Sequence, residues 1–436
     1  MKAKLLLAIL LVVAITFSAP VMAQEKATKK CPGASSTTAG TGMHREGHCK
    51  ADHSYGFKFS GFFKADLIYD QTRVSVGDYV IYVPAGPEND VMNITARETR
   101  LGLNFFWKDQ ECGIRTDAKL EFDFYGLGAS KSNDFSKENK PAPMLRHAYI
   151  KVTKGNWSLL AGQTSDVISP LVPKTVNYTV AWGQGNIGYR RPQFRISGIM
   201  PVTDAFKIKT AVAASRTLGG DLDGDEIDDG ADSAIPTFQG RLAFCSKFGD
   251  SGKVELGFSG HYGKEEYTKE EVDTSEVAIE SWSFNVDFLL KPNDIITLSG
   301  EYFTGQVLGS YLGGVLQSVN PLNQEIGSKG GWGMVSIKPC KKLMINAGYA
   351  WDDPDEDDFA IPESPGAGHS FKDLNSCIFG NIMYSLTSNV TAMLEVSSLK
   401  TTYMSKVYDT VKSEIVSSSE DYDDIRIQFA LKAAIK

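Results

Sequence analysis

Apolar and polar side chains alternate along most of the chain, and this is the pattern of a β-strand with one oily and one hydrated face. In the segment 55–70, Phe57 and Phe59 fall on one face, whereas Lys58 and Lys64 fall on the other. A membrane barrel and a soluble sandwich both tolerate such a strand, so a single strand does not separate these two classes of protein.

The same alternation recurs often enough to predict about sixteen strands joined by turns and polar links. The predicted strands are 55–70, 93–107, 112–126, 143–154, 156–163, 191–199, 204–215, 234–248, 252–265, 278–291, 293–305, 328–338, 342–351, 372–386, 388–402 and 420–435. Between these strands, short turns alternate with the long links 71–92, 127–142, 164–190, 216–233, 266–277, 306–327, 352–371 and 403–419. An even strand number with this rhythm favours an all-β, transmembrane, antiparallel up-and-down barrel with short periplasmic turns and long extracellular loops.

The first residues indicate export. Lys2 and Lys4 precede an apolar stretch, and Val21-Met22-Ala23 has the form of a signal-peptidase site. We therefore expect a signal peptide over 1–23, a flexible periplasmic segment over 24–54 and the barrel over 55–436. No later run is long and apolar enough for a membrane-spanning helix, and a closed barrel is the other way across a bilayer.

Composition narrows the function classes. The mean hydropathy of −0.19 is typical of a soluble protein, but membrane barrels have similar values because they expose alternate residues to water. The net charge of −8, from 45 basic and 53 acidic residues, argues against a nucleic-acid partner. Motifs typical of hydrolases and nucleotide-binding enzymes are absent, so we expect no enzyme activity and no required cofactor.

Tryptophans near predicted strand ends suggest the aromatic girdles of a membrane barrel. They are Trp107, Trp157, Trp282, Trp332 and Trp351. The alternative is the ordinary aromatic content of a strand-rich protein.

The link 164–190 is the strongest functional candidate because long links without regular structure are usually functional. We expect it to fold inward and narrow the lumen. It leads into a strand on which Arg191, Gln193 and Arg195 lie opposite Phe194. Guanidinium groups beside an aqueous pore attract anions, and carboxylates above all. The expected constriction residues are Arg100, Arg115, Arg146, Asp166, Lys174, Arg191, Gln193 and Arg195.

The alternative for these arginines is structural. Glu98, Asp117, Glu121 and Asp123 are available to pair with them as bridges along the wall. The sequence leaves both readings open.

The link 221–232 carries carboxylates at alternate positions, which is a feature of calcium-binding loops. Asp221, Asp223, Asp225 and Asp229 would be the ligands, although Glu226 stands where a calcium loop has glycine. A solvated acidic loop tip is the other interpretation. Among the six cysteines, Cys31 and Cys49 could form a disulfide in an oxidising compartment.

Several motifs resemble the DcaP-like trimeric outer-membrane porins, most clearly over residues 57–195. The matching stretches are Gly61–Asp66, Arg97–Gly102, Leu120–Gly126, Leu145–Tyr149, Ala161–Ser165 and Arg191–Arg195. The resemblance implies a sixteen-stranded, homotrimeric pore that takes up small anions such as dicarboxylates, with the third long loop as its eyelet. It places the chain in the outer membrane, with lipid and lipopolysaccharide as partners.

Two functions from different classes therefore remain. The first is passive diffusion of small, dicarboxylate-like anions through a porin. The second is a barrel that serves as an envelope anchor or adhesin, with acidic, cation-binding extracellular loops.

Overall fold

The computed structural model describes residues 53–75, 77–87, 89–109, 113–126, 141–220, 222, 228–268 and 276–435. The expected signal peptide 1–23, nearly all of the segment 24–54 and the cysteines Cys31, Cys49 and Cys112 lie outside these residues.

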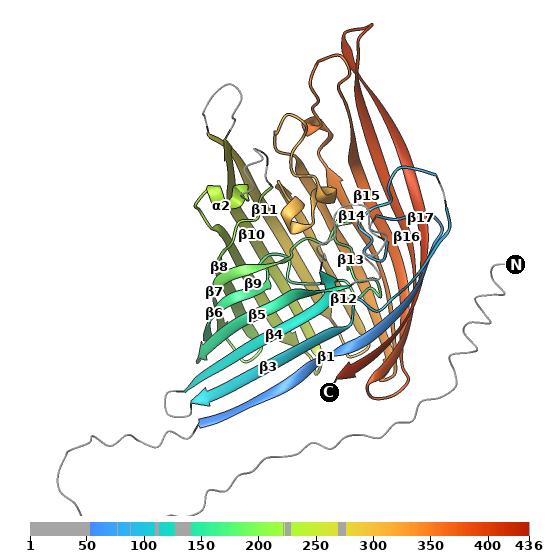
Figure 1. Cartoon of the computed structure of the whole chain (residues 1–436). Helices are drawn as coiled ribbons and strands as arrows, with labels where there is room; N and C mark the ends of the chain where they lie inside the picture. The colour runs from blue at the N-terminus through green and yellow to red at the C-terminus, as the bar shows by residue number, and fades with distance from the viewer. Residues whose placement is uncertain are drawn as a thin grey trace, which may run out of the picture. The chain divides into compact units, whose positions relative to one another are not determined.

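The described strands form one antiparallel sheet that closes on itself (Figure 1). They are β1 (His53–Asp70), β2 (Val91–Thr95), β3 (Arg100–Asp109), β4 (Ile114–Gly126), β5 (Ala142–Lys154), β6 (Trp157–Ser165), β7 (Arg190–Pro201), β8 (Phe206–Ser215), β9 (Thr237–Phe248), β10 (Gly252–Thr268), β11 (Glu276–Lys291), β12 (Ile296–Gln306), β13 (Gly327–Cys340), β14 (Leu343–Pro354), β15 (Gly368–Ser385), β16 (Val390–Asp409) and β17 (Glu414–Ile435). β1 pairs with both β2 and β3, each strand from β3 onward pairs with the next, and β17 pairs with β1 from Gly61↔Ile435 to Asp70↔Arg426. The barrel predicted from the alternation is confirmed.

The predicted strand 93–107 is interrupted. Both β2 and β3 pair with β1, so they share one of sixteen positions round the ring. Between them Arg97 leaves the strand line and forms a buried ion pair with Asp78. Opposite this break Gly61 has φ +126°, and a Cβ there would lie 2.0 Å from the carbonyl oxygen of Arg100. The interruption therefore coincides with an ion pair to another link, which a periodicity argument does not detect.

The expected division of faces is present. On β1, Phe57 and Phe59 are 67% and 64% exposed on the outside, whereas Lys64 and Asp66 are buried on the inside. On β4, Leu120 faces outward and Asp123 is fully buried. Because a barrel in a bilayer turns its oily side chains to lipid, this is the arrangement of a membrane-spanning sheet.

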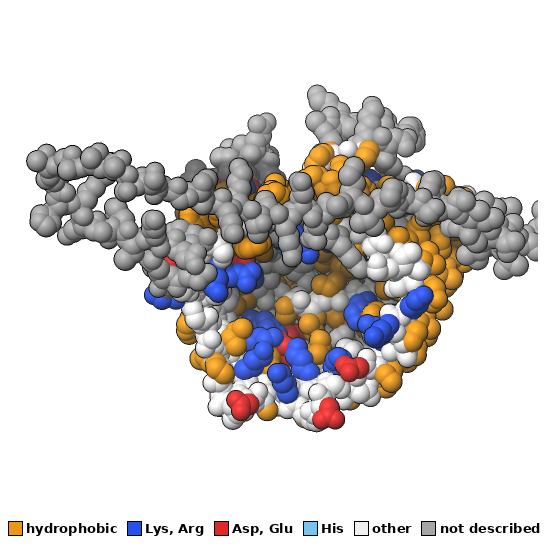
Figure 2. Space-filling view, turned by 90° about the horizontal axis from the view of Figure 1, so that it is seen from below, with side chains coloured by type: hydrophobic (Ala, Val, Ile, Leu, Met, Phe, Trp, Pro, Cys, Tyr) orange, Lys and Arg blue, Asp and Glu red, His pale blue; other side chains and the backbone are white. Residues whose placement is uncertain are grey.

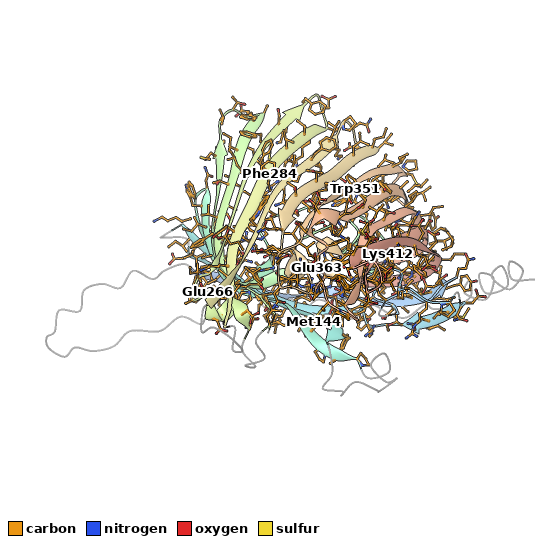
Figure 3. The ribbon with its side chains drawn as sticks, turned by 90° about the horizontal axis from the view of Figure 1, so that it is seen from above. Met144, Glu266, Phe284, Trp351, Glu363 and Lys412 are labelled. Atoms are coloured by element: carbon orange, nitrogen blue, oxygen red, sulfur yellow. The ribbon has the colours of Figure 1, made fainter. Side chains whose placement is uncertain are left out.

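The links differ between the two ends of the barrel. Figure 1 shows tight turns at the end that holds the C-terminus, and taller strands and longer links at the other end. The link predicted as 403–419 is an exception, because β16 and β17 continue as paired strands to Asp409 and Glu414. In the view from the long-link end, Glu363 and Lys412 mark the links after β14 and β16, and Phe284 lies on the wall at β11 (Figure 3).

In the described part of the chain, three links turn into the lumen instead of outward, at 71–90, 166–189 and 307–326. Short helices occur in or beside the links: α2 (Asp229–Asp232), η1 (Gly309–Tyr311), η2 (Gly314–Leu316) and η3 (Glu356–Asp358). Val80 and Val83 of the first inward link pack with Trp332 and Phe379 of the wall. Trp332 is therefore an inward residue only 3% exposed, and the prediction that it belongs to an outer aromatic girdle is wrong. Trp107 and Trp157, in contrast, are exposed on strands that end at the short turns.

Among the described residues, no helix is both long and apolar enough to cross a bilayer.

We predict that Phe284→Arg, on the outer face of β11, lowers the free energy of unfolding in liposomes by about 2–4 kcal/mol, since it places a charge in lipid. Denaturant titration of the barrel folded into vesicles measures this change. The matched control is Val411→Arg in the link after β16, where Val411 is 92% exposed, and this substitution should have little effect. Equal effects of the two substitutions would mean that the β11 face is not in lipid.

Candidate pore constriction

The third link lies along the inner wall of the barrel. Its backbone N–H groups donate to side chains of three separate strands: Val167 to Gln239 on β9 (2.6 Å), Leu171 to Glu301 on β12 (2.7 Å) and Val176 to Glu395 on β16 (2.7 Å). The link then reaches the opposite wall, where the Tyr178 hydroxyl donates to Asp123 on β4 (2.9 Å). It therefore narrows the lumen and is fixed to the wall at these four contacts.

Two buried carboxylates hold this link in place. Glu395 accepts from the N–H groups of Val176 and Asn177 and from the Asn381 amide (2.8 Å). Glu301 accepts from the Leu171 N–H and from the Trp332 indole (3.2 Å). Because backbone groups inside a barrel need partners, each carboxylate replaces the hydrogen bonds that water would otherwise supply.

Arg191, at the start of β7, is fully buried. Its Nε lies 2.9 Å from Asp166 Oδ1, its Nη2 donates to the Ser310 carbonyl (3.2 Å), and its guanidinium stacks 3.8 Å above the Tyr311 ring. The same Asp166 accepts from the Gln239 amide (2.7 Å). This cation thus joins the third link to η1 of the link 307–326, and it is packed away from any solute path.

Arg195 lies on the same face as Arg191 and has different partners. Its Nε donates to Gln193 Oε1 (2.8 Å) and its Nη2 to the Ser165 carbonyl oxygen. Gln193 is buried and donates to the Thr164 and Ser165 carbonyls. The hydrogen-bond partners of Arg195 are therefore neutral, and among the described residues its half-buried guanidinium forms no close ion pair.

Arg100 and Arg146 share the carboxylates of β4. Arg146 contacts Asp123 (2.5 Å) and Glu121 (3.3 Å) and donates to the Tyr178 hydroxyl (2.8 Å). Arg100 lies farther off, 3.8 Å from Glu121 and 3.9 Å from Asp123. For Arg146, the structural alternative raised from the sequence matches the geometry, since its pairs are short and buried.

The remaining cationic candidates lie toward the short-turn end. Arg115 is exposed and paired with Asp117 (2.6 Å) on its own strand. The backbone N–H of Lys174 donates to Met334 Sδ (3.3 Å), and its Nζ lies 3.4 Å from the Ser336 hydroxyl. The structure therefore groups Asp166, Arg191, Gln193 and Arg195 in one place and Arg100 with Arg146 in another.

The calcium hypothesis is only partly covered, because Asp221, Asp223 and Asp225 lie outside the described residues. Asp229 is described and fully buried, and its carboxylate accepts from the Leu222 N–H (3.1 Å). Within the described part of the chain, no group of three or more His, Cys, Asp or Glu side chains could hold a metal ion.

Sequence reasoning missed the first and sixth links as parts of the lumen. The apolar run Tyr79–Val83 inside a long polar link was the available signal, since such residues need a core. Ile81 packs with Tyr178 and Trp182, and its carbonyl accepts from the Gln184 amide (3.0 Å). No local pattern marked Glu301 and Glu395 as anchors, because their partners lie more than a hundred residues away.

We predict that Glu395→Ala releases the third link locally. Two buried N–H groups lose their acceptor, which costs about 1–3 kcal/mol, so amide exchange at Val176 and Asn177 should accelerate roughly tenfold or more. Hydrogen–deuterium exchange with mass spectrometry checks this outcome. Glu363→Ala, in an exposed link, serves as the control. Unchanged protection at residues 176–177 would contradict the anchoring role.

Comparisons with solved structures agree on the fold. The chain is similar to the outer membrane channel DcaP of Acinetobacter baumannii, with a TM-score of 0.66, 17% identity, and coverage of 87% of this chain and 97% of that chain. It is also similar to an anion-selective porin from Comamonas acidovorans, with a TM-score of 0.52, 13% identity, and coverage of 88% and 100%. No protein-family model and no curated protein matches the sequence. The chain thus has the closed-barrel fold of outer-membrane porins, the fold that the resemblance to the DcaP-like family implied.

Proposed function

We propose that this chain is an outer-membrane porin through which small anionic solutes diffuse passively. The barrel fold, the oily outer face and the similarity to solved channels support the coarse assignment. The anionic preference goes further and rests on charges in the lumen. It agrees with the anion selectivity of one similar structure, the porin from Comamonas acidovorans.

The observation that carries the proposal is the unequal accessibility of charge beside the third link. The carboxylates there are buried and already occupied: Asp166 by Arg191, Asp123 by Arg146, Glu301 and Glu395 by backbone amides. The cations Arg195 and Lys174 remain partly exposed, and their hydrogen-bond partners are neutral. A passing ion therefore meets mainly positive potential, which lowers the barrier for anions.

The proposed selectivity set is smaller than the set expected from the sequence. Arg195 and Lys174 would act on the solute directly. Arg191 and Arg146 would act as positioning residues, since they hold the link 166–189 against the wall. Dicarboxylates suit such a site because each carboxylate can accept from a guanidinium fork or an ammonium group.

We also propose the assembly that the resemblance implies, a homotrimer embedded in lipid and lipopolysaccharide. Wide outward surfaces carry exposed apolar side chains, including Phe194 on β7 and Ile378 on β15. Part of this surface would meet lipid and part would meet neighbouring subunits.

Planar-bilayer recording tests the function. We expect stable open currents and, across a potassium chloride gradient, a reversal potential displaced toward that of chloride. A barrel that inserts without conducting would contradict the porin proposal and favour the alternative of an envelope anchor or adhesin. A reversal potential displaced toward potassium would contradict the anionic preference alone.

Two substitutions on the same strand separate the roles of its arginines. Arg195→Gln should shift the reversal potential toward that of potassium while the barrel keeps its stability. Arg191→Gln leaves Asp166 buried without its cation, so it should lower the free energy of unfolding by roughly 3–5 kcal/mol. Denaturant titration combined with bilayer recording distinguishes the two. If Arg195→Gln left the reversal potential unchanged, this residue would have no part in selectivity.

A further inference from the structure

A second group of cationic side chains lies at the short-turn end, below the constriction. It lines a cavity of about 410 Å³ between β11, β12, β13 and β14. The lining residues are Lys174, Lys291, Asp294, Ile295, Thr297, Ser336, Lys338, Cys340, Lys341 and Met344. Figure 2 views the barrel from this end and shows Lys and Arg side chains gathered in and around the hollow, with few acidic ones among them.

The charges of this cavity do not balance. Its one carboxylate, Asp294, is 2.7 Å from Lys291 and is used by that pair. Among the described residues, Lys174, Lys338 and Lys341 form no close ion pair, and the nearest acidic group that acts on Lys338 is the same Asp294. Burial and the neighbouring charge of Lys338 lower the pKa of Lys174, as expected when like charges converge without a counterion.

Lys174 is fixed in this position by its backbone. Its N–H donates to Met334 Sδ, and its carbonyl accepts from the Asn381 amide at 2.7 Å. The side chain thus reaches the cavity from the third link, while Lys338 and Lys341 reach it from the β13–β14 turn. Two separate parts of the chain hold like charges together, at an energetic cost that a bound anion would remove.

Some other lumen cations form close ion pairs, unlike Lys174, Lys338 and Lys341. Arg241 contacts Asp287 (2.6 Å) and Glu255 (3.2 Å), and Lys209 contacts the same Glu255 (2.7 Å). The wall at β8 and β9 therefore holds paired charges, whereas the lysines of this cavity are close to one another without such pairs.

We propose that this lysine-lined cavity binds a soluble oxyanion that carries two or more negative charges, of the phosphate or polycarboxylate class. Three ammonium groups can each direct donors to a different oxygen, and lysine binds phosphate as a point charge. A monovalent anion would leave most of the positive charge uncompensated. The site lies at the exit of the constriction and would hold such anions there.

Cys340 gives a direct readout, because it lines the cavity as an exposed free thiol, whereas Cys245 and Cys377 are buried. The experiment exposes the detergent-solubilised full chain to N-ethylmaleimide with increasing inorganic pyrophosphate, and follows the Cys340 peptide by mass spectrometry. We expect pyrophosphate to slow modification of Cys340 at concentrations where chloride of equal ionic strength does not. Binding is measured without current, so its failure is distinct from a failure of the porin proposal.

Substitutions locate the effect. The double variant Lys174→Gln/Lys338→Gln should need roughly tenfold or more pyrophosphate for the same protection, since each lysine supplies a charged hydrogen bond. Lys151→Gln is the matched control, because Lys151 lines a basic cavity at the same end between β1, β3, β4 and β5. The pairing order places β4 and β12 on opposite sides of the ring. This control should keep full protection.

Three outcomes would overturn the proposal. The first is modification of Cys340 at the same rate with and without pyrophosphate. The second is equal weakening by the control and by the double variant, which would indicate a diffuse surface potential. The third is protection by micelles that contain an anionic phospholipid but not by pyrophosphate, which would assign the lysines to a lipid headgroup.

Discussion

The structure depends on one requirement: inside a bilayer every backbone N–H and C=O must find a partner within the protein. The pairing of β17 with β1 meets it by leaving no open edge in the sheet. Closure also creates a lumen, and the period of two then sends alternate side chains into it. The apolar outer face and the charged inner face are two consequences of the same ring.

The lumen applies the same requirement to the links that enter it. A chain that folds inward brings backbone N–H groups into a crowded interior, where side chains must replace water. Glu301, Glu395 and Gln239 do so from three different strands, each accepting from a backbone amide of the third link. From the sequence alone, the carboxylates of Glu301 and Glu395 would be expected to attract cations. In the structure they are occupied by backbone N–H groups. The cations left accessible, Arg195 and Lys174, then dominate the field that a solute meets.

Much of the fold could be predicted, because strand alternation is a local property. All sixteen strand positions were found, and the face shared by Arg191, Gln193 and Arg195 was correct. The break between β2 and β3 was not, because it coincides with the Arg97–Asp78 pair, whose partners lie in different elements. The inward course of the links 71–90 and 307–326 was not predicted for a similar reason, since the residues that pack against these links lie on distant strands.

The candidate site was harder to predict than the fold. Residue type and face identified the arginines, but their roles depend on pairing across the barrel. Arg191 is buried against Asp166 and Tyr311, while the hydrogen-bond partners of Arg195, four residues later, are neutral. The lysine-lined cavity brings together Lys174 and Lys338, which are far apart in sequence, so no sequence motif indicates this cavity.

The most direct test of the account is the accessibility of spin labels placed one at a time along residues 114–120 of β4 in liposomes. The account predicts a period of two. A water-soluble nickel chelate should reach labels at 115, 117 and 119, which line a cavity at the short-turn end, and oxygen dissolved in lipid should favour labels at 114, 116, 118 and 120. Equal exposure of successive positions to the two reagents would contradict a closed barrel with a lipid face and an aqueous interior.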